Sequence, residues 1–304
     1  MVAFGMQLPI QSQSTIFVQP WEATAGPAEL VRVARACDAA GFDYVAVCDH
    51  VAIPADKAPA MSTTWWDTVA TLSFLAAVTE RVRLLSHVYV LPYRHPLVAA
   101  KAWSTLDRLS GGRAILGVGS GHVEGEFDAL GVTFAERGRL LDEAIDAVRT
   151  ALAEEFPTHR GQRWSFDDVG QRPRPVQSAV PIWVGGSSKP AMRRAAERGD
   201  GWLPQGPPEG GMAAGIEYVR AHRAATRGDE PIVLGGLSGP LYVGRPSWEA
   251  RAVTGPPDKV AAYLRTLADL GIDQIQVGFV SRSAEELCDQ IAAFAADVAP
   301  LVNG

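Results

Sequence analysis

Residues 84–122 read LLSHVYVLPYRHPLVAAKAWSTLDRLSGGRAILGVGSGH and contain two apolar runs separated by a helix-like segment. The first run, Val82 to Leu91, is interrupted at Ser86-His87, and its lack of regular polar alternation predicts a strand buried on both faces. The second run, Ala114 to Val118, leads into a glycine-rich segment. Two parallel strands joined by a helix form one βα unit, whose strand ends build a pocket wall.

The segment between the two runs carries start and stop signals for a helix. Pro96 suits the first turn, where its missing N–H costs no hydrogen bond, and Gly111-Gly112 favours termination. The helical spacing predicts one buried face that comprises Val98, Ala102, Trp103, Leu106 and Leu109.

Similar apolar runs alternate with helical patterns along the whole chain. We predict strands at Ala3–Leu8, Tyr44–Cys48, Val82–Leu91, Ala114–Val118, Pro181–Val184, Gly201–Leu203, either Ile232–Leu234 or Leu241–Val243, and Gln274–Phe279. Eight such units predict an α/β fold, a single TIM (β/α)8 barrel domain over residues 1–304. A doubly wound sheet also alternates but needs no eighth strand. Residues 156–180 are expected to form an irregular excursion, with room for a short strand pair.

Composition narrows the class of protein. The chain has 304 residues, of which 47% are hydrophobic, and a net charge of −6 that disfavours nucleic acid or an acidic membrane as partner. Three cysteines without CxxC spacing predict reduced thiols. The N-terminus lacks a signal peptide, and no apolar stretch is long enough to cross a bilayer. We therefore expect a soluble cytoplasmic protein that acts on a small molecule.

Asp49-His50 follow the second predicted strand, at the end of a barrel where catalytic residues gather. A histidine can give or take a proton at neutral pH. The alternative is an aspartate that caps the following turn beside an exposed histidine, and position alone leaves both interpretations open.

His87-Val88 lie within the third predicted strand. A histidine in an apolar strand is usually a hydrogen-bonded core residue, whereas a functional interpretation has the backbone bent here against a flat ligand. Further on, Gly119-Ser120-Gly121-His122 would allow close approach of a ligand. A dinucleotide fold is rejected, because Glu126 and Phe127 are expected in a loop and the next helix near Ala135, too late for a Rossmann fingerprint.

Gly185-Gly186-Ser187-Ser188 separate the fifth predicted strand from a helix that opens at Pro190. Backbone N–H groups, two hydroxyls and a helix N-terminus together can bind a phosphate. The alternative is an ordinary turn in which a serine caps the helix. The doubled hydroxyl pair favours phosphate.

Two further residue types carry weaker signals. The six histidines show no HxH, HxxxH or HExxH spacing, so no metal site is predicted, and a metal-dependent hydrolase stays an outside alternative. Tryptophans in or beside predicted loops would suit an aromatic or bulky apolar substrate: Trp21, Trp65, Trp66 and Trp202.

Four long motifs resemble the luciferase-like monooxygenase superfamily, in particular its bacterial coenzyme F420-dependent (deazaflavin) branch. They are LPYRHP, AKAWSTLDRLSGGRAILGVGSG, EFDALGVTFAERGRLLDEAIDAV and PIWVGGSSKPAMRRAAERGDGW. The resemblance extends from Ala3 to about Trp202 and weakens afterwards. It implies a TIM barrel with an excursion after the fourth strand, a flavin or deazaflavin at the carboxyl ends of the strands, and a homodimer.

The resemblance also implies roles for individual residues. Asp49-His50 would contact the coenzyme, and a cis peptide bond at His87–Val88 would back its ring system. Ser120 and Gly121 would line the ring and linker, and the turn Gly185 to Ser188 would bind the phosphate. The proton would be handled by His50 or His122, with His50 favoured by its position.

The chain also departs from the sugar-phosphate dehydrogenases of that branch. They carry a catalytic glutamate where this chain has His122, and polar coenzyme contacts where it has Val90 and Gly125. The resemblance therefore argues against sugar-phosphate oxidation. It implies hydride transfer between the deazaflavin C5 and an unsaturated or carbonyl compound. The alternatives are an FMN-dependent monooxygenase using reduced flavin and O2, and a barrel that only carries a flavin.

Overall fold

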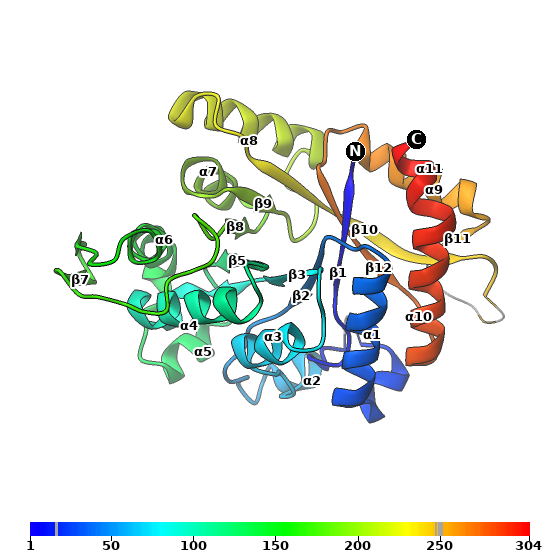
Figure 1. The fold of residues 1–304 in the computed structure, drawn as a ribbon, viewed down its shortest axis with the longest axis horizontal. Helices are drawn as coiled ribbons and strands as arrows, with labels where there is room; N and C mark the ends of the chain where they lie inside the picture. Colours follow the sequence, from blue (N-terminus) through cyan, green and yellow to red (C-terminus); the bar gives the residue numbers. More distant parts are fainter. Residues whose placement is uncertain (16–17, 247, 249–251) are drawn as a thin grey trace.

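The protein forms a closed parallel barrel of eight strands, seen in a computed structural model that describes residues 1–15, 18–246, 248 and 252–304 (Figure 1). Pairing between β9 and β10 closes the ring. The barrel strands are β1 (Ala3–Gln7), β2 (Tyr44–Val47), β3 (Arg83–Ser86), β5 (Ala114–Gly119), β8 (Ile182–Gly185), β9 (Gly201–Leu203), β10 (Val233–Val243) and β12 (Gln274–Phe279). The predicted fold class is thus confirmed.

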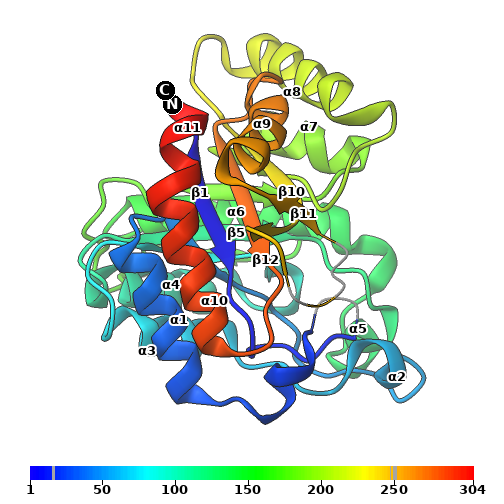
Figure 2. The ribbon, with the colours of Figure 1, turned by 90° about the vertical axis from the view of Figure 1, so that its right-hand side faces the viewer.

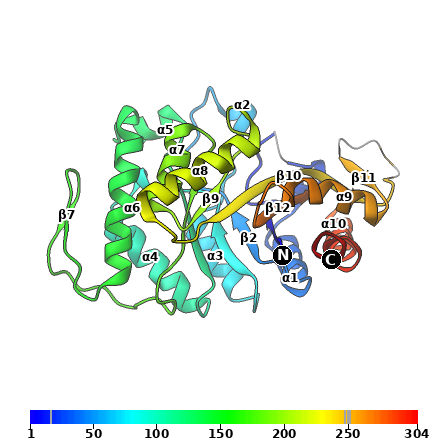
Figure 3. The same cartoon turned by 90° about the horizontal axis from the view of Figure 1, so that it is seen from above.

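Helices surround this barrel (Figures 1 and 3). They are α1 (Pro27–Ala39), α2 (Ala58–Met61), α3 (Thr68–Ala76), α4 (Pro96–Leu109), α5 (Glu124–Ala129), α6 (Arg137–Ala153), α7 (Lys189–Arg198), α8 (Gly211–Arg227), α9 (Pro257–Ala268), α10 (Ala284–Ala293) and α11 (Ala299–Asn303). Short additional strands are β4 (Tyr89–Val90), β6 (His159–Arg160), β7 (Ser165–Phe166) and β11 (Val253–Gly255).

The excursion after β5 and α6 contains a strand pair, as the sequence allowed. β6 and β7 pair antiparallel, with His159 opposite Phe166. In the view from above, β7 lies at the opposite edge of the molecule from α9 and α10 (Figure 3). The seventh barrel strand resolves the open choice differently from either alternative. Apart from Ile232, both proposed segments belong to the single strand β10, whose register with β12 shifts between Leu237 and Pro240.

The third predicted strand is not continuous. It divides into β3 and β4 at His87–Val88, where the peptide bond is cis, as the resemblance implies. Both halves still pair with β5, Leu84 with Ala114 and Tyr89 with Val118.

Neighbouring glycines make room for this break. A Cβ atom at Gly117 would lie 1.9 Å from the Ser86 carbonyl oxygen, and one at Gly119 would lie 2.4 Å from a Val88 methyl. On β8, the strand that pairs with β5 on its other side, a Cβ at Gly185 would lie 2.5 Å from the other Val88 methyl. No side chain fits at such distances. The glycine-rich ends of β5 and β8 are therefore explained, at three positions, by packing around the interrupted third strand.

Two expectations about helices were wrong. Glu126 and Phe127 lie on the short helix α5 rather than in a loop, and both are buried. On α4, Val98 and Leu109 are 62% and 64% exposed instead of facing the core. Small residues form much of the true buried face, which comprises Pro96, Ala99, Ala100, Trp103, Ser104, Leu106 and Asp107.

The inside of the barrel is packed with side chains. Tyr44 and Trp183 meet edge to face with ring centroids 5.8 Å apart, in a buried cluster with Ala46, Leu85, Ile115 and Leu203. Val88 packs against the same cluster from the side of the carboxyl ends. The two chain ends lie side by side on the outside (Figure 2), where Asn303 Oδ1 accepts a hydrogen bond from Val2 N at 2.6 Å.

Candidate active site

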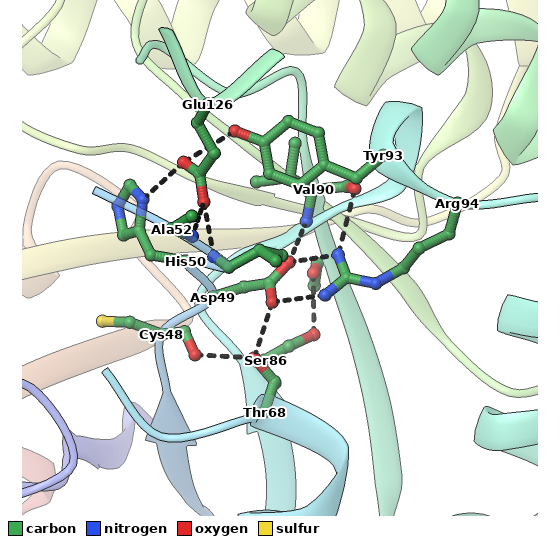
Figure 4. Close-up of polar contacts among 12 residues, drawn as sticks. Cys48, Asp49, His50, Ala52, Thr68, Ser86, Val90, Tyr93, Arg94 and Glu126 are labelled. Carbon is green, nitrogen blue, oxygen red and sulfur yellow. Dashed lines mark hydrogen bonds and ion pairs between the residues drawn. The ribbon is translucent and has the colours of Figure 1, made fainter. Parts of the chain in front are cut away.

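Side chains from three segments meet beyond the carboxyl ends of β2, β4 and β5 (Figure 4). Asp49-His50 directly follow β2, Tyr93 and Arg94 follow β4, and Glu126 comes from α5 beyond β5. This is the end of a TIM barrel at which active sites are built.

Asp49 is buried and its carboxylate is bound within the protein. Arg94 forms a two-pronged ion pair with it, at 2.6 Å to Oδ2 and 2.8 Å to Oδ1. Oδ2 also accepts from Val90 N at 2.8 Å, and Thr68 Oγ1 lies 3.1 Å from Oδ1. Arg94 in turn stacks over the Tyr89 ring, with its guanidinium carbon 4.0 Å from the centroid. Asp49 therefore ties the exit of β2 to β4, and a coenzyme contact through its side chain remains a prediction.

His50 is held by a buried glutamate. Its Nδ1 lies 2.9 Å from Oε2 of Glu126, whose side chain has no solvent exposure, while the His50 side chain is 10% exposed. The His50 ring also packs against Trp65, with 4.3 Å between the ring centroids. The imidazole is thus held by a carboxylate at Nδ1 and by a neighbouring indole whose plane is tilted by 59° to its own.

Glu126 binds four donors. The backbone N–H groups of Val51 and Ala52 donate to Oε1, the second at 3.1 Å, and the Tyr93 hydroxyl donates to Oε2 at 2.9 Å. Burial alone would raise the pKa of Glu126, but the hydrogen bonds from His50, Val51 and Ala52 outweigh it, so its pKa is lowered. Burial, together with the charge of Glu126, raises the pKa of Tyr93, which remains a protonated donor.

His122 stands beside His50, and the two sequence-predicted catalytic residues are thus brought together. Their ring centroids are 5.6 Å apart and the planes are nearly perpendicular. His122 is exposed, yet the surrounding protein atoms lower its pKa, the neighbouring His50 lowers it further, and Glu126 opposes both. A second imidazole, exposed and with a lowered pKa, therefore lies beside His50.

His87 is buried within the barrel. Burial lowers its pKa to about 4, and the Gln276 amide opposes this only in part. Neither ring nitrogen makes a hydrogen bond within the described part of the chain, and Gln276 Oε1 is equally without a partner. Gln276 therefore lies close enough to act on the ring charge without forming a good hydrogen bond. The expectation of a hydrogen-bonded core histidine is not met.

Val88, Ser120 and Gly121 are partly exposed at the strand ends. Val88 rests on Gly119 and Gly185 with its two methyl groups. Gly121 has a φ of +76°, and a Cβ there would collide with Phe127 at 2.8 Å, so the backbone needs glycine at this position. Together these residues form a small surface without bulky side chains beside His122.

In the turn after β8, both serine hydroxyls make hydrogen bonds within the protein. Ser187 Oγ donates to Gly206 O at 2.6 Å and accepts from Gln205 N at 3.0 Å, while Ser188 caps α7 by accepting from Ala191 N at 3.4 Å. Trp202, buried in β9 rather than at the mouth, donates its indole N–H to Gly186 O at 2.8 Å. The capping interpretation thus describes Ser188, and a phosphate site remains a prediction that relies on backbone N–H groups.

Sequence reasoning missed Glu126, Tyr93 and Arg94 as site residues. Tyr93 and Arg94 stand inside the LPYRHP motif, between the two prolines, and that position was a usable signal. Glu126 offered none, because Glu124 and Asp128 flank it at similar spacing and only the fold shows which of the three acids is buried.

The described residues lack the marks of a metal site and of a membrane-spanning helix. In the described residues no three His, Cys, Asp or Glu side chains are grouped to hold a metal ion, and Cys37, Cys48 and Cys288 are free thiols. No helix among them is both long and apolar enough to cross a bilayer.

Known proteins resemble this chain over much of its length. The Mycobacterium tuberculosis protein Rv0940c is 32% identical over 185 residues, which cover 57% of this chain and 64%, less than two thirds, of that protein. The FMNH2-dependent dimethylsulfone monooxygenase of Pseudomonas fluorescens is 29% identical over 197 residues, 64% of this chain and 52% of that enzyme.

Solved structures share the fold. Monooxygenase RslO1 from Streptomyces bottropensis superposes with a TM-score of 0.79 at 24% identity, covering 98% of this chain and 99% of that one. The coenzyme F420-dependent tetrahydromethanopterin reductase from Methanopyrus kandleri gives a TM-score of 0.72 at 17% identity, with coverages of 98% and 99%. The sequence profile of the luciferase-like monooxygenase family matches residues 3–254. The chain therefore belongs to the luciferase-like monooxygenase family.

Proposed function

We propose that this protein is a coenzyme F420-dependent oxidoreductase that transfers a hydride between the deazaflavin C5 and a small unsaturated or carbonyl compound. The observation that carries the proposal is His50, held by Glu126 at the carboxyl end of β2 with His122 beside it. An imidazole so placed can exchange the proton that accompanies hydride transfer. Deazaflavin as the coenzyme is supported by the motifs that resemble the F420-dependent branch.

The residues at the strand ends fit a planar ring. Val88 rests on Gly119 and Gly185, so it offers an apolar face with no larger side chain beside it at those two positions. Ser120 supplies a hydroxyl, and Gly121 leaves the backbone accessible. A tricyclic ring needs such a flat, mostly apolar support with few polar groups around it.

A phosphate group would be held at the start of α7. Ser187 uses its hydroxyl in the contacts to Gln205 and Gly206, so its backbone N–H, that of Ser188 and the Ser188 hydroxyl remain as donors. The helix dipole of α7 adds to them. Lys189, exposed in the first turn, adds positive charge, and its ammonium also forms an exposed ion pair with Glu209 at 3.9 Å.

A bound reduced deazaflavin would supply the hydride, and the chain would supply placement and the proton. His50 exchanges the proton with the substrate, and His122 connects His50 to solvent. Trp65 restricts the access of water to the His50 ring. Substrates with apolar or aromatic groups suit this surrounding.

An FMN-dependent monooxygenase is the second candidate. The similarity to the FMNH2-dependent dimethylsulfone monooxygenase of Pseudomonas fluorescens favours it. The same apolar support would hold an isoalloxazine ring, because the two ring systems share their shape. Reduced flavin and O2 would then replace the hydride donor.

Binding and turnover separate these candidates. The purified protein is titrated with F420 and FMN while the absorbance or fluorescence of each coenzyme is followed, and reduced F420 is then tested with a panel of enones, imines and ketones. We expect F420 binding and F420 oxidation that depends on one substrate class. Tight FMN binding without F420 binding would reject the proposal.

A matched pair of variants tests the role of His50. His50→Ala should lower kcat by about 10²-fold or more and leave F420 affinity nearly unchanged. His222→Ala is the control, because His222 also pairs with a glutamate, Glu197 at 3.0 Å, but on α8 outside this site. Equal turnover in both variants would remove His50 from the mechanism.

A further inference from the structure

Glu126 gathers hydrogen bonds from two loops onto one buried carboxylate. His50, Val51 and Ala52 come from the loop after β2, and Tyr93 from the segment after β4. The side chain has no solvent exposure, and all four partners approach its two oxygens. A group with this many contacts cannot move without breaking several of them.

The chemistry of these contacts determines where the hydrogens lie. An ionised carboxylate only accepts hydrogen bonds, and backbone N–H groups and the Tyr93 hydroxyl donate to it. The hydrogen bond of 2.9 Å between Glu126 Oε2 and His50 Nδ1 therefore requires a hydrogen on Nδ1. In the neutral ring this leaves Nε2 as the unprotonated nitrogen.

We propose that Glu126 is a positioning residue that holds His50 in its Nδ1–H tautomer and makes Nε2 the atom that exchanges the proton with substrate. The inference rests on the proposed function, in which His50 handles that proton. Tyr93 assists by fixing Oε2, to which its hydroxyl donates at 2.9 Å. A half-turn of the His50 ring would bring Cδ2 to the position of Nδ1, which would break the hydrogen bond to Glu126 and leave a buried carboxylate short of a partner.

The proton balance is simple for reduction of a carbonyl compound. A reduced deazaflavin held at the strand ends would supply the hydride, and with it the two electrons, that the carbonyl carbon takes up. The carbonyl oxygen takes the proton from Nε2 of the charged His50 ring. His50 becomes neutral with its hydrogen still on Nδ1, bound to Glu126. Solvent restores the Nε2 proton before the next cycle, and the reverse direction runs through the same atoms.

The tautomer can be measured without any turnover. With 15N-labelled histidine, the correlation pattern of the two ring nitrogens distinguishes Nδ1–H from Nε2–H in the neutral ring at alkaline pH. The His50 signals are identified by their loss in His50→Ala. We expect Nδ1–H in the wild type. The Nε2–H tautomer in the wild-type protein would overturn the proposal, whatever the variants do.

Two substitutions on α5 provide the matched comparison. Glu126→Gln keeps the shape but offers both a donor and an acceptor to Nδ1, so the Nε2–H tautomer should become populated. Glu124→Gln, on an exposed residue of the same helix, should keep the wild-type pattern. Should Glu126→Gln not fold, Tyr93→Phe takes its place. It removes one donor from Oε2, and the Nδ1–H signal should broaden or shift.

Kinetics complete the test. With the substrate found in the panel, Glu126→Gln should reduce kcat by about 10²-fold while the F420 dissociation constant stays within about twofold of wild type, because the tautomer is wrong and the coenzyme support is intact. Unchanged kcat would overturn the positioning role. Failure of the proposed function looks different, because no deazaflavin would bind even though His50 could still show the Nδ1–H tautomer.

Discussion

His87 has two ring nitrogens buried without a hydrogen-bond partner in the described part of the chain. Burial of this kind penalises the charged form, which is why the pKa falls from 6.5 to about 4. The unfolded chain therefore takes up a proton at a higher pH than the folded protein does. Stability contributed by neutral His87 is complete above about pH 6.5 and is lost as the pH falls toward 4.

The first prediction concerns His87→Gln, which removes this titration. The free energy of unfolding of the wild type should fall relative to that of the variant between pH 6.5 and 4, by up to about 3 kcal/mol. Urea titrations at pH 7, 5.5 and 4 measure the free energy of unfolding of both proteins. The relevant result is how the difference between them changes with pH, because the substitution can also add a difference that is the same at every pH. The exposed His95→Gln should follow the wild type. Parallel curves for wild type and His87→Gln would contradict the prediction.

Individual site residues could be predicted from sequence when they stand at a strand exit. Asp49 and His50 directly follow an apolar run, His122 follows another after Gly119-Ser120-Gly121, and the structure places the two histidines together. Glu126 could not be found in this way. Its burial results from the approach of the loop after β2, a contact 74 to 76 residues away along the chain that no local pattern reports.

At the scale of elements, the break between β3 and β4 decides the composition of its neighbours. β5 carries Gly117 and Gly119, and β8 ends in Gly185, because the Ser86 carbonyl and the Val88 methyl groups occupy the space that side chains would need. The cost of a larger residue there should depend on Val88 itself.

The second prediction tests this dependence. Gly119→Ala should destabilise the protein by about 1–3 kcal/mol, because the new methyl collides with Val88. Combined with Val88→Ala, it should cost less than the sum of the two single changes. Gly278→Ala on β12 is the control, since a Cβ there meets nothing within 4 Å. Chemical denaturation of the four variants gives the coupling free energy between positions 88 and 119. If the two single changes in stability simply add in the double variant, Val88 is not what obstructs a side chain at position 119.

The limits of pattern reading are clearest in α4, α5 and β10. On α4 the large residues Val98 and Leu109 fit a helical stripe, yet Ala99 and Ala100 are buried because small residues let neighbouring helices approach. The six-residue helix α5 is too short to show a period. β10 contains Gly235, Gly236 and Gly239, which interrupt the apolar pattern and made one strand look like two candidates.

At the scale of the whole molecule, the first and last segments hold each other in place. Asn303 Oδ1 accepts from Val2 N at 2.6 Å, and its amide nitrogen donates to Val2 O at 2.9 Å. β1, which begins one residue later, pairs with β2 and β12 within the barrel wall. The link therefore connects the last helix to β1, the strand that lies between β2 and β12 in the ring.

The third prediction follows from that link. Asn303→Ala removes both hydrogen bonds and should lower the free energy of unfolding by about 1 kcal/mol, with faster hydrogen exchange at the start of β1. Leu301→Ala, an exposed neighbour on α11, serves as the reference. Equal free energies of unfolding and equal hydrogen-exchange rates in the two variants would show that the contact at the chain ends does not stabilise the protein.

The buried cluster of aromatic and aliphatic side chains against which Val88 packs has a consequence for the order in which ligands bind. Tyr44, Trp183 and their neighbours pack together inside the barrel, so the coenzyme and substrate of the proposed reaction would both enter from the carboxyl ends of the strands. Of two ligands bound there, the one that lies deeper would have to bind first and dissociate last. Steady-state kinetics should accordingly show a compulsory-order mechanism, in which the outer ligand slows dissociation of the inner one.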